Sequence, residues 1–381
     1  MKGRRSESTL GAEITLAEPS NSSGGSPFYG RVLRLDGTTL TLSTSEGVHS
    51  ESLKMPPNVA IDAGDLVRIC APGRLELIRK NDSAVPLEQQ DWWRLHRILP
   101  NLKTRHRLLR EIRTYFDAQH FLEIEAPQLI PYPSQEVHLS SIEASAGGEK
   151  RYLATSPEPH MKRLLSSGIE KIYSLGKAFR DEEQGSHHLN EFTLLEWYRV
   201  DAGVDQLMSD VSALVQLATG GKERSWTRLS VAEALKRWGT PTQDPEDVIR
   251  QLVEHVEPQL AKLGCVFLTD YPAELASLAR LRPEDPTISE RFEAYVDGIE
   301  LANGFGELTC PVEQRARFES DQHARAQTGR PVYPLDEPFL QALHAGMPPA
   351  AGIALGIDRL VMIATQSSSI EEVVAFTTER A

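Results

Sequence analysis

The densest run of charged and aromatic residues in this chain, residues 179–199, predicts a glycine-containing loop followed by a β-strand. Side chains alternate between the two faces of a strand, so Glu196 and Tyr198 would share one face while Trp197 points to the other. An acid beside a phenol, if both are buried, is a receptor for an ammonium group. The competing interpretation is an exposed charged hairpin, which is the commoner outcome for a charge-rich loop.

A second cluster, residues 298–307, carries two carboxylates on two strand-like pieces. Glu300 and Glu307 lie on either side of Asn303-Gly304, which we expect to join the two pieces. Two carboxylates held close together repel each other, so they need a cation between them, either Mg²⁺ or an amine. The alternative is two separate acids on the protein surface.

A third cluster, residues 352–362, is a glycine-rich apolar strand that leads into an Asp-Arg helix start. Gly356 would let a ligand approach the backbone, and Arg359 could hold a phosphate group. The alternative is a buried strand followed by an ordinary helix cap.

The composition changes along the chain in a way that predicts several segments. Residues 1–26 are rich in Ser, Gly and Glu and predict a disordered tail. Short β-type runs separated by glycines follow over residues 27–80, and they predict a small β-barrel of the OB or SH3 type. Residues 81–91 are polar and contain Pro86, which indicates a linker. Residues 92–381 then form the main domain.

The pattern of the main domain favours an α+β fold. Helices are expected after Pro100 to about residue 120 and at residues 202–219, 230–238, 244–263, 311–328 and 337–345. Strands are expected at residues 121–127, 153–155, 172–175, 192–198, 265–269, 295–302 and 306–309. Because strands and helices do not alternate regularly, an antiparallel sheet is favoured over a doubly wound one. The sequence has neither a P-loop nor a GxGxxG motif, so any ATP site must be built in another way.

Composition and charge exclude several classes of protein. Cys70, Cys265 and Cys310 are far apart in sequence, which argues against a disulfide framework or a zinc site and fits a reducing cytosol. The net charge of −13 mildly disfavours nucleic acid as the main partner. No window approaches the ~18 apolar residues of a membrane span, and the basic N-terminus lacks the apolar stretch of a signal peptide. We therefore expect a cytoplasmic, globular enzyme.

Taken together, the three clusters resemble the signature motifs of class II aminoacyl-tRNA synthetases. Residues 121–127 with the preceding helix resemble motif 1, residues 179–199 motif 2, and residues 352–359 motif 3. The amino-acid sequence of these motifs is similar to that of the lysyl branch, notably at residues 155–158 and 300–309. The resemblance covers residues 92–381 and implies a class II catalytic domain, an antiparallel sheet flanked by helices, behind the OB-like region. It also implies a homodimer.

Two families of the lysyl branch compete: the lysyl-tRNA synthetases and the elongation factor P β-lysine ligases. Residues 156–165, 290–305 and 352–362 are similar to the ligases, and Ala354 replaces a glycine that is usual in the synthetases. The resemblance therefore implies that lysine or (R)-β-lysine is activated with ATP and Mg²⁺ as an acyl-adenylate and transferred to a lysine side chain of elongation factor P. A shortened lysyl-tRNA synthetase that charges tRNA and a non-catalytic regulatory paralogue are the alternatives.

The resemblance also implies the role of individual residues. Arg180 would bind the α-phosphate and the reacting carboxylate, Arg359 would hold the γ-phosphate, and both would be catalytic. The residues implied to bind the amino acid are Ser156, Pro157, Glu158, Glu196, Tyr198, Asn303, Glu307 and Ala354. The residues implied to bind ATP are Arg180, Asp181, Glu182, Leu189, Asn190, Glu300, Leu301, Gly356 and Arg359. Glu300 and Glu307 would hold the metal ion.

The chain departs from the family pattern in two places. The family loop usually reads His-Asn-Pro-Glu-Phe, whereas residues 188–192 read His-Leu-Asn-Glu-Phe, so Leu189 replaces an asparagine that contacts ATP. Unless a shift of the loop lets Asn190 substitute, one hydrogen bond worth about 1 kcal/mol is lost. The second departure is the β-rich region at residues 27–80, which we interpret as a reduced anticodon-type module or a module that docks the acceptor.

Overall fold

The fold was obtained as a computed structural model, which describes residues 13–15, 27–36, 39–52, 60–71, 74–182, 184–242 and 244–381. The chain divides into two compact units, Met1–Pro100 and Asn101–Ala381. The boundaries that the sequence suggested for the β-rich region, the linker and the main domain stay predictions.

The first unit contains a six-stranded antiparallel sheet with the order β1-β6-β5-β2-β3-β4. The strands are β1 (Glu13–Thr15), β2 (Phe28–Asp36), β3 (Thr39–Thr44), β4 (Gly47–Ser52), β5 (Leu66–Ala71) and β6 (Arg74–Arg79). Apolar residues at every second position form its core, and Val32, Leu40 and Val67 are fully buried. The sheet is consistent with the predicted OB-like region.

Two predictions for the N-terminal part of the chain are corrected by the structure. Residues 13–15 belong to the predicted tail, yet they form β1 and pair with β6; the rest of that tail lies outside the described residues. Helix α1 (Asp91–Ala118) begins well before the predicted start and contains Pro100. A proline removes one backbone hydrogen bond, and the helix continues through it. Aromatic contacts support the first turns, because the rings of Trp93 and His96 are 5.1 Å apart.

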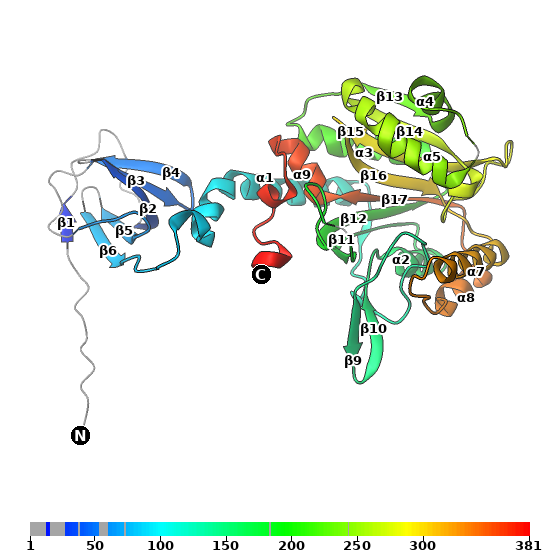
Figure 1. The fold of residues 1–381 in the computed structure, drawn as a ribbon, viewed down its shortest axis with the longest axis horizontal. Helices are drawn as coiled ribbons and strands as arrows, with labels where there is room; N and C mark the ends of the chain where they lie inside the picture. Colours follow the sequence, from blue (N-terminus) through cyan, green and yellow to red (C-terminus); the bar gives the residue numbers. More distant parts are fainter. Residues whose placement is uncertain are drawn as a thin grey trace. The chain divides into compact units, whose positions relative to one another are not determined.

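The second unit is built on an eight-stranded sheet with the order β13-β14-β15-β16-β17-β12-β11-β7. Its strands are β7 (Leu122–Glu123), β11 (Lys171–Phe179), β12 (Glu191–Val200), β13 (Trp226–Ser230), β14 (Cys265–Pro272), β15 (Ile288–Val296), β16 (Ile299–Gly306) and β17 (Ala350–Gly356). Only the two edge pairs, β13–β14 and β7–β11, are parallel. A small sheet of β8 (Leu129–Ile130), β9 (Glu143–Ala146) and β10 (Glu149–Leu153) stands beside it, and the β9–β10 hairpin projects from the unit (Figure 1). The predicted α+β fold with an antiparallel sheet is confirmed.

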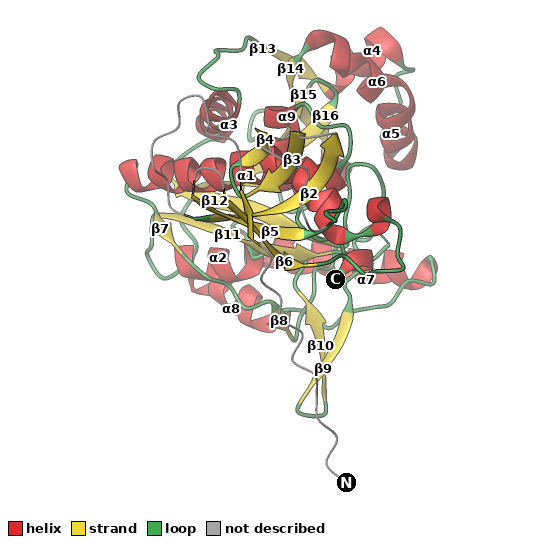
Figure 2. Cartoon of the chain, turned by 90° about the vertical axis from the view of Figure 1, so that its left-hand side faces the viewer, coloured by secondary structure: helices red, strands yellow, loops and turns green. Residues whose placement is uncertain are grey.

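Helices cover both faces of the large sheet. They are α2 (Glu158–Leu165), α3 (Val204–Ala218), α4 (Val231–Trp238), α5 (Pro245–Gln251), α6 (Glu257–Leu260), α7 (Pro311–Gln327), α8 (Glu337–Ala345) and α9 (Ile357–Thr365). Residues of α1, α3 and α9 pack on one face of the central strands, whereas residues of α2, α7 and α8 pack with Ile172, Tyr198 and Ala350 on the other face. Helices α4, α5 and α6 gather beside β13 and β14 (Figures 1 and 2). No helix in the described part of the chain is long and apolar enough to cross a membrane.

Most predicted helices are confirmed, while several predicted strands are shorter or displaced. The segment predicted as one helix at residues 244–263 is α5, a π-helical turn, α6 and a short 3-10 turn in succession. The strand predicted at residues 121–127 is reduced to β7, and the one at residues 153–155 is only the end of β10. Residues 306–309 form no separate strand, because β16 ends at Gly306.

The interpretation of Asn303-Gly304 as a join between two strand pieces is wrong. Both residues lie inside β16, and the true turn is at Asp297 and Gly298, where φ is 52° and 85°. A Cβ atom on Gly304 would come within 2.9 Å of the Ile353 side chain. Gly304 therefore allows the adjacent strands and their side chains to pack closely. From sequence alone, a glycine needed for close packing cannot be distinguished from a glycine in a turn.

A buried polar network holds β12 to the helices behind it. Asp210 on α3 accepts hydrogen bonds from Trp197 Nε1 at 3.0 Å, from Tyr115 Oη at 2.8 Å, and from Arg199 Nε and Nη2, each at 2.8 Å. Asp210 and Arg199 are both buried, at 1% and 6% exposure. A buried carboxylate with this many donors fixes the position of the strand.

We expect Asp210→Ala to lower the free energy of unfolding by about 3–5 kcal/mol, because it leaves the buried Arg199 guanidinium without its counter-ion. The matched control is Asp205→Ala on the same helix, whose partner Arg228 is exposed; it should change the stability by less than about 1 kcal/mol. Urea denaturation of both variants measures the difference, and equal effects would contradict the role of the network.

Candidate active site

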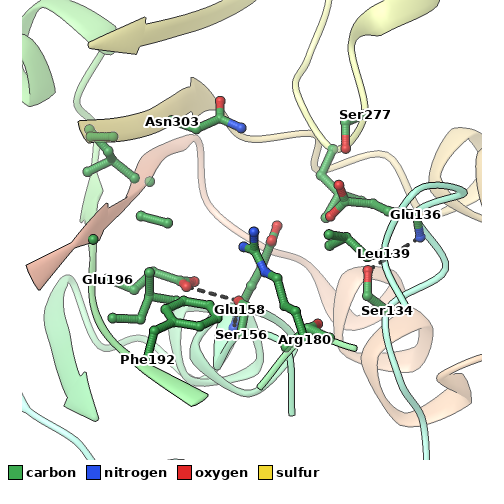
Figure 3. A pocket seen from close by; sticks show the side chains of 18 of the residues that line it. Ser134, Glu136, Leu139, Ser156, Glu158, Arg180, Phe192, Glu196, Ser277 and Asn303 are labelled. Carbon is green, nitrogen blue, oxygen red and sulfur yellow. Dashed lines mark hydrogen bonds between the residues drawn. The ribbon is translucent and has the colours of Figure 1, made fainter. Parts of the chain in front are cut away.

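A cavity of about 390 Å³ opens on the face of the large sheet that carries Glu196 and Tyr198. Its walls come from β12, β16 and β17, from the loops at residues 130–139 and 187–189, and from the starts of α2 and α9. Figure 3 shows Glu196, Ser156 and Glu158 close together, with the Arg180 side chain extending into the cavity beside them. The three sequence clusters thus meet in one cavity.

One end of the cavity carries a buried carboxylate held by hydroxyl groups. Tyr198 Oη donates to Glu196 Oε1 at 2.6 Å, and Ser156 Oγ donates to Glu196 Oε2 at 2.9 Å. The Ser156 hydroxyl also accepts the backbone N–H of Glu158 at 2.9 Å. Glu196 and Tyr198 are each 2% exposed. The alternative of an exposed charged hairpin is therefore wrong for this pair, and the shared face of the strand is confirmed.

Burial changes the protonation of this group. It raises the pKa of Glu196 to about 8, and the charge of Glu158 adds to the effect, while hydrogen bonds from Tyr198 and Ser156 oppose it. Burial also raises the pKa of Tyr198 well above its usual value, and the Glu196 charge adds to that shift. A cation that enters the cavity therefore stabilises the charged form of Glu196.

Glu307 lies behind the cavity wall rather than in it. It is 1% exposed, is not among the lining residues, and its Oε2 is 2.5 Å from Lys162 Nζ. The same ammonium is 2.5 Å from Glu158 Oε1. Burial alone would lower the pKa of Lys162, but the charges of Glu158 and Glu307 raise it above its usual value. The cation that Glu307 was predicted to receive is thus supplied by the chain itself, and sequence reasoning missed Lys162.

The two predicted arginines line the other part of the cavity. The Arg180 guanidinium lies over the Phe192 ring, 5.1 Å from its centroid. Arg359 Nη1 donates to the Glu300 carbonyl at 2.7 Å and is 3.1 Å from Glu300 Oε2, and Arg359 Nη2 is 2.6 Å from His188 Nε2. Both guanidinium groups carry donors that match phosphate oxygens.

An ion pair at the start of α9 fixes the position of the helical turn that carries Arg359. The buried Asp358 accepts from Arg105 Nη1 at 2.5 Å and from the backbone N–H of Thr193 at 2.7 Å. Arg105 Nη2 also donates to Thr193 Oγ1 at 2.7 Å. The start of α9 is therefore tied to both α1 and β12.

The other predicted residues divide into two groups. Those that line the cavity are Ser156, Glu158, Leu189, Glu300, Leu301, Asn303, Ala354 and Gly356. Those that do not are Pro157, Asp181, Glu182, Asn190 and Glu307. Leu189 is 8% exposed and packs in the main core. The Asn190 amide does not replace it, because Nδ2 donates to the Arg180 carbonyl at 2.8 Å. Their predicted roles in binding stay predictions.

Sequence reasoning missed a charged pair on β15. Arg291 Nη2 donates to Glu293 at 2.8 Å and Arg291 Nε to Asn303 Oδ1 at 3.2 Å, and both charged residues line the cavity. Tyr295 Oη also donates to Glu293 at 2.8 Å. The signal was available, because residues 291, 293 and 295 share one face of a strand with period two.

The predicted Mg²⁺ site can be compared with the acids present. Glu300 lines the cavity, but Glu307 is already paired with Lys162, so the second carboxylate on this wall is Glu293. The described residues contain no group of three or more His, Cys, Asp or Glu that could hold a metal. One or two carboxylates are nevertheless enough for Mg²⁺ that arrives with substrate phosphates. Glu300 and Glu293 are thus the acids on this wall that could hold the ion, and each of them is also paired with an arginine, Arg359 and Arg291.

Comparison with known proteins gives one consistent result. The family described as tRNA synthetases class II (D, K and N) matches residues 89–380. The elongation factor P–(R)-β-lysine ligase of Vibrio cholerae is 39% identical over 313 residues, which are 74% of this chain and 97% of that protein. Ligases of the same name from Erwinia tasmaniensis and Klebsiella pneumoniae are each 39% identical, over 76% of this chain and 98% of theirs. Nearly the whole length of these relatives is thus matched by about three quarters of this chain.

A glycine in β17 offers a direct test of how tightly this site is packed. A Cβ on Gly352 would lie 2.2 Å from the Tyr198 ring and 2.3 Å from Glu307 Oε1. We expect Gly352→Ala to lower the free energy of unfolding by about 1–3 kcal/mol, as overpacking does. Gly356→Ala is the control, because the three atoms nearest its Cβ would be Arg359 side-chain atoms at 3.6–3.8 Å, which is ordinary van der Waals contact. Thermal and urea unfolding measure both variants, and equal stability would show that the packing is looser than described.

Proposed function

The chain belongs to the class II (D, K and N) tRNA synthetase family and to its elongation factor P–(R)-β-lysine ligase branch, and from this premise we propose that it ligates a lysine-type amino acid to elongation factor P. In this proposal lysine or (R)-β-lysine is activated with ATP as an acyl-adenylate and passed to a lysine side chain of the factor. One observation carries the proposal: the cavity that holds Arg180 and Arg359 also holds the buried Glu196 with no ion-pair partner among the described residues.

The position of Glu196 selects the amino acid. A carboxylate that is 2% exposed and bonded only to hydroxyl groups is unfavourable when charged, so a substrate ammonium stabilises it. An apolar or acidic side chain at this place would leave the buried acid unpaired. In a solvent-exposed site the same ammonium would add little binding free energy, because exposed ion pairs contribute little.

The first chemical step needs no protein nucleophile. The substrate carboxylate oxygen attacks the α-phosphorus of ATP, the bond to the β-phosphate oxygen breaks, and pyrophosphate leaves. In this proposal Arg180 holds the α-phosphate and the carboxylate together, and Arg359 holds the terminal phosphate. Mg²⁺, when bound through Glu300 and Glu293, would supply additional positive charge at the phosphates.

The second step joins the activated acid to the acceptor. The unprotonated lysine amine of elongation factor P attacks the acyl carbon, an amide bond forms, AMP leaves, and the amine loses one proton. The proposal includes the cytoplasmic, homodimeric form that the resemblance implies. The wall of the cavity at residues 130–139 and the loop at residues 187–189 would enclose the adenylate during transfer.

The acceptor is tested by incubating the purified protein with ATP, lysine or (R)-β-lysine, and either elongation factor P or tRNA. We expect the factor to gain the mass of one aminoacyl group in intact-mass spectrometry and the tRNA to remain uncharged. Charged tRNA with an unmodified factor would instead identify a shortened lysyl-tRNA synthetase. No ATP–pyrophosphate exchange with any amino acid would identify a non-catalytic paralogue.

Arg180→Ala should lower the rate of adenylate formation by about 10²–10³-fold, as the loss of one donor to a developing charge does, without changing the melting temperature. ATP–pyrophosphate exchange measures the rate. The matched control is Arg315→Ala, an exposed arginine paired with Glu337 on α8, which should exchange at the unchanged rate. An Arg180→Ala variant that remains fully active would refute the role of this side chain.

A further inference from the structure

Arg325, near the end of α7, is a cation that the fold buries completely without an acidic partner. It is 0% exposed, and in the part of the chain that the structure describes no carboxylate lies within ion-pair distance of it. Its Nε donates to the Pro331 carbonyl at 2.7 Å, and its Nη1 donates to the Glu136 and Leu139 carbonyls at 2.7 and 2.8 Å. The guanidinium also lies over the Tyr333 ring, 4.3 Å from its centroid. Because burying a charge without a counter-ion is costly, stability alone does not account for a cation at this place.

The loop that Arg325 holds is part of the cavity wall. Glu136 and Leu139, whose carbonyls accept from the guanidinium, both line the cavity. The loop is tied down a second time, because Gln135 Nε2 donates to the Pro334 carbonyl at 2.9 Å. These bonds come from buried donors to backbone carbonyls, so they fix the place from which the Glu136 side chain starts.

The side chain of Glu136 ends in the cavity without a partner. Figure 3 shows its carboxylate turned toward the cavity. Among the described residues no hydrogen bond or ion pair reaches this carboxylate; only the backbone of Glu136 is bonded. Burial raises the pKa of Glu136, and the charge of Glu158 adds to the shift, whereas the charges of Arg180 and Arg291 oppose it. An unpaired carboxylate on a fixed wall is a binding group for a cation.

We propose that Glu136 binds the substrate amine next to the reacting carboxylate and shares it with Glu158, and that Arg325 is the positioning residue that holds Glu136 in place. This inference rests on the proposed function, which supplies an amino acid with two amines. Lysine carries the second amine on the first carbon from its carboxylate, and (R)-β-lysine carries it on the second. Glu136 thus acts on the end of the substrate that reacts, whereas Glu196 acts on the far end.

The surroundings of Glu136 indicate this amine rather than the other. In the proposed function Arg180 holds the reacting carboxylate, and the charges of Arg180 and Glu158 both act on Glu136. Glu158 alone does not complete the site, because its Oε1 already lies 2.5 Å from Lys162 Nζ. An ammonium group has three donors, so a second carboxylate supplies acceptors for the donors that Glu158 leaves free.

The contact is tested by removing each side of it in turn. 6-Aminohexanoic acid keeps the carboxylate and the far amine of lysine and of (R)-β-lysine but lacks the amine next to the carboxylate. We expect Glu136→Gln to weaken the binding of both diamino acids by about tenfold and that of 6-aminohexanoic acid by less than about twofold, because only the former lose a charged hydrogen bond. Calorimetry with the full chain measures the dissociation constants, with 6-aminohexanoic acid titrated in competition with the diamino acid.

Arg325→Met tests the positioning role, because it removes the donors behind Glu136 without leaving a buried charge. It should weaken the binding of the diamino acids and spare that of 6-aminohexanoic acid, as Glu136→Gln does. Added to Glu136→Gln, it should weaken binding by less than about a further twofold, because the two residues act on one contact. Should Arg325→Met fail to fold, Arg325→Lys decides: it keeps the charge but lacks the guanidinium fork, and it should show the same pattern.

Two exposed residues provide matched controls. Arg315→Met removes an arginine of the same helix that is paired with Glu337, and Glu143→Gln removes the charge of an acid paired with Lys150; both should leave every dissociation constant unchanged. Equal effects of Glu136→Gln on the diamino acids and on 6-aminohexanoic acid, or no effect on either, would overturn the role of Glu136. Effects of the Arg325 and Glu136 variants that multiply in full, or no effect of the Arg325 variant, would overturn the positioning role.

Activity measurements distinguish this inference from the proposed function. If the wild-type protein binds the diamino acids but shows neither ATP–pyrophosphate exchange nor transfer to elongation factor P, the proposed function fails, and the dissociation constants still decide the inference. If the protein binds neither diamino acid, both are overturned. Exchange and transfer without the expected pattern of binding overturn the inference alone.

Discussion

The alternation of side chains between the two faces of strand β12 is the constraint on which the rest of the structure depends. Trp197 and Arg199 point to the helical face, where Asp210 binds both side chains. Glu196 and Tyr198 consequently point to the opposite face and into the cavity. A slip of one residue in the pairing of β12 would exchange these two sets. It would bury an acid against the apolar core and expose tryptophan to the cavity, so the core network and the site enforce the same register.

The charge at the end of the cavity follows from what this register brings together. Glu158, Glu196 and Glu307 come from three different elements, and one lysine cannot neutralise all of them. Acids gathered in this way repel one another, and among the described residues the 2%-exposed Glu196 has no ion-pair partner. In the proposed function, an amino acid with a cationic side chain would relieve that cost when it binds, so selectivity for a lysine-type substrate would follow from how the chain distributes its own charges.

Much of this arrangement could be predicted from sequence, because its signals are local. Period two on β12 placed Glu196 beside Tyr198, and a glycine-rich strand running into Asp358-Arg359 predicted β17 and α9. What could not be predicted depends on contacts between distant elements. Gly304 looks like a turn until Ile353 is seen against it. In the sequence Lys162 is one of several basic residues on α2, and only the structure shows that it pairs with Glu307, which lies far along the chain.

The replacement of the family asparagine by Leu189 now has a physical explanation. Leu189 packs in the main core while it lines the cavity, so it offers a ligand an apolar surface. The neighbouring Asn190 is also unavailable to a nucleotide, because its amide donates to the Arg180 carbonyl and its Oδ1 accepts from Gln184. The backbone N–H of Arg180 donates in turn to the Asn190 carbonyl at 2.9 Å. In this chain the loop therefore holds the backbone of Arg180 through Asn190. In the proposed function, a fixed Arg180 would offset part of the hydrogen bond lost with the asparagine, because it reduces the cost of organising the site.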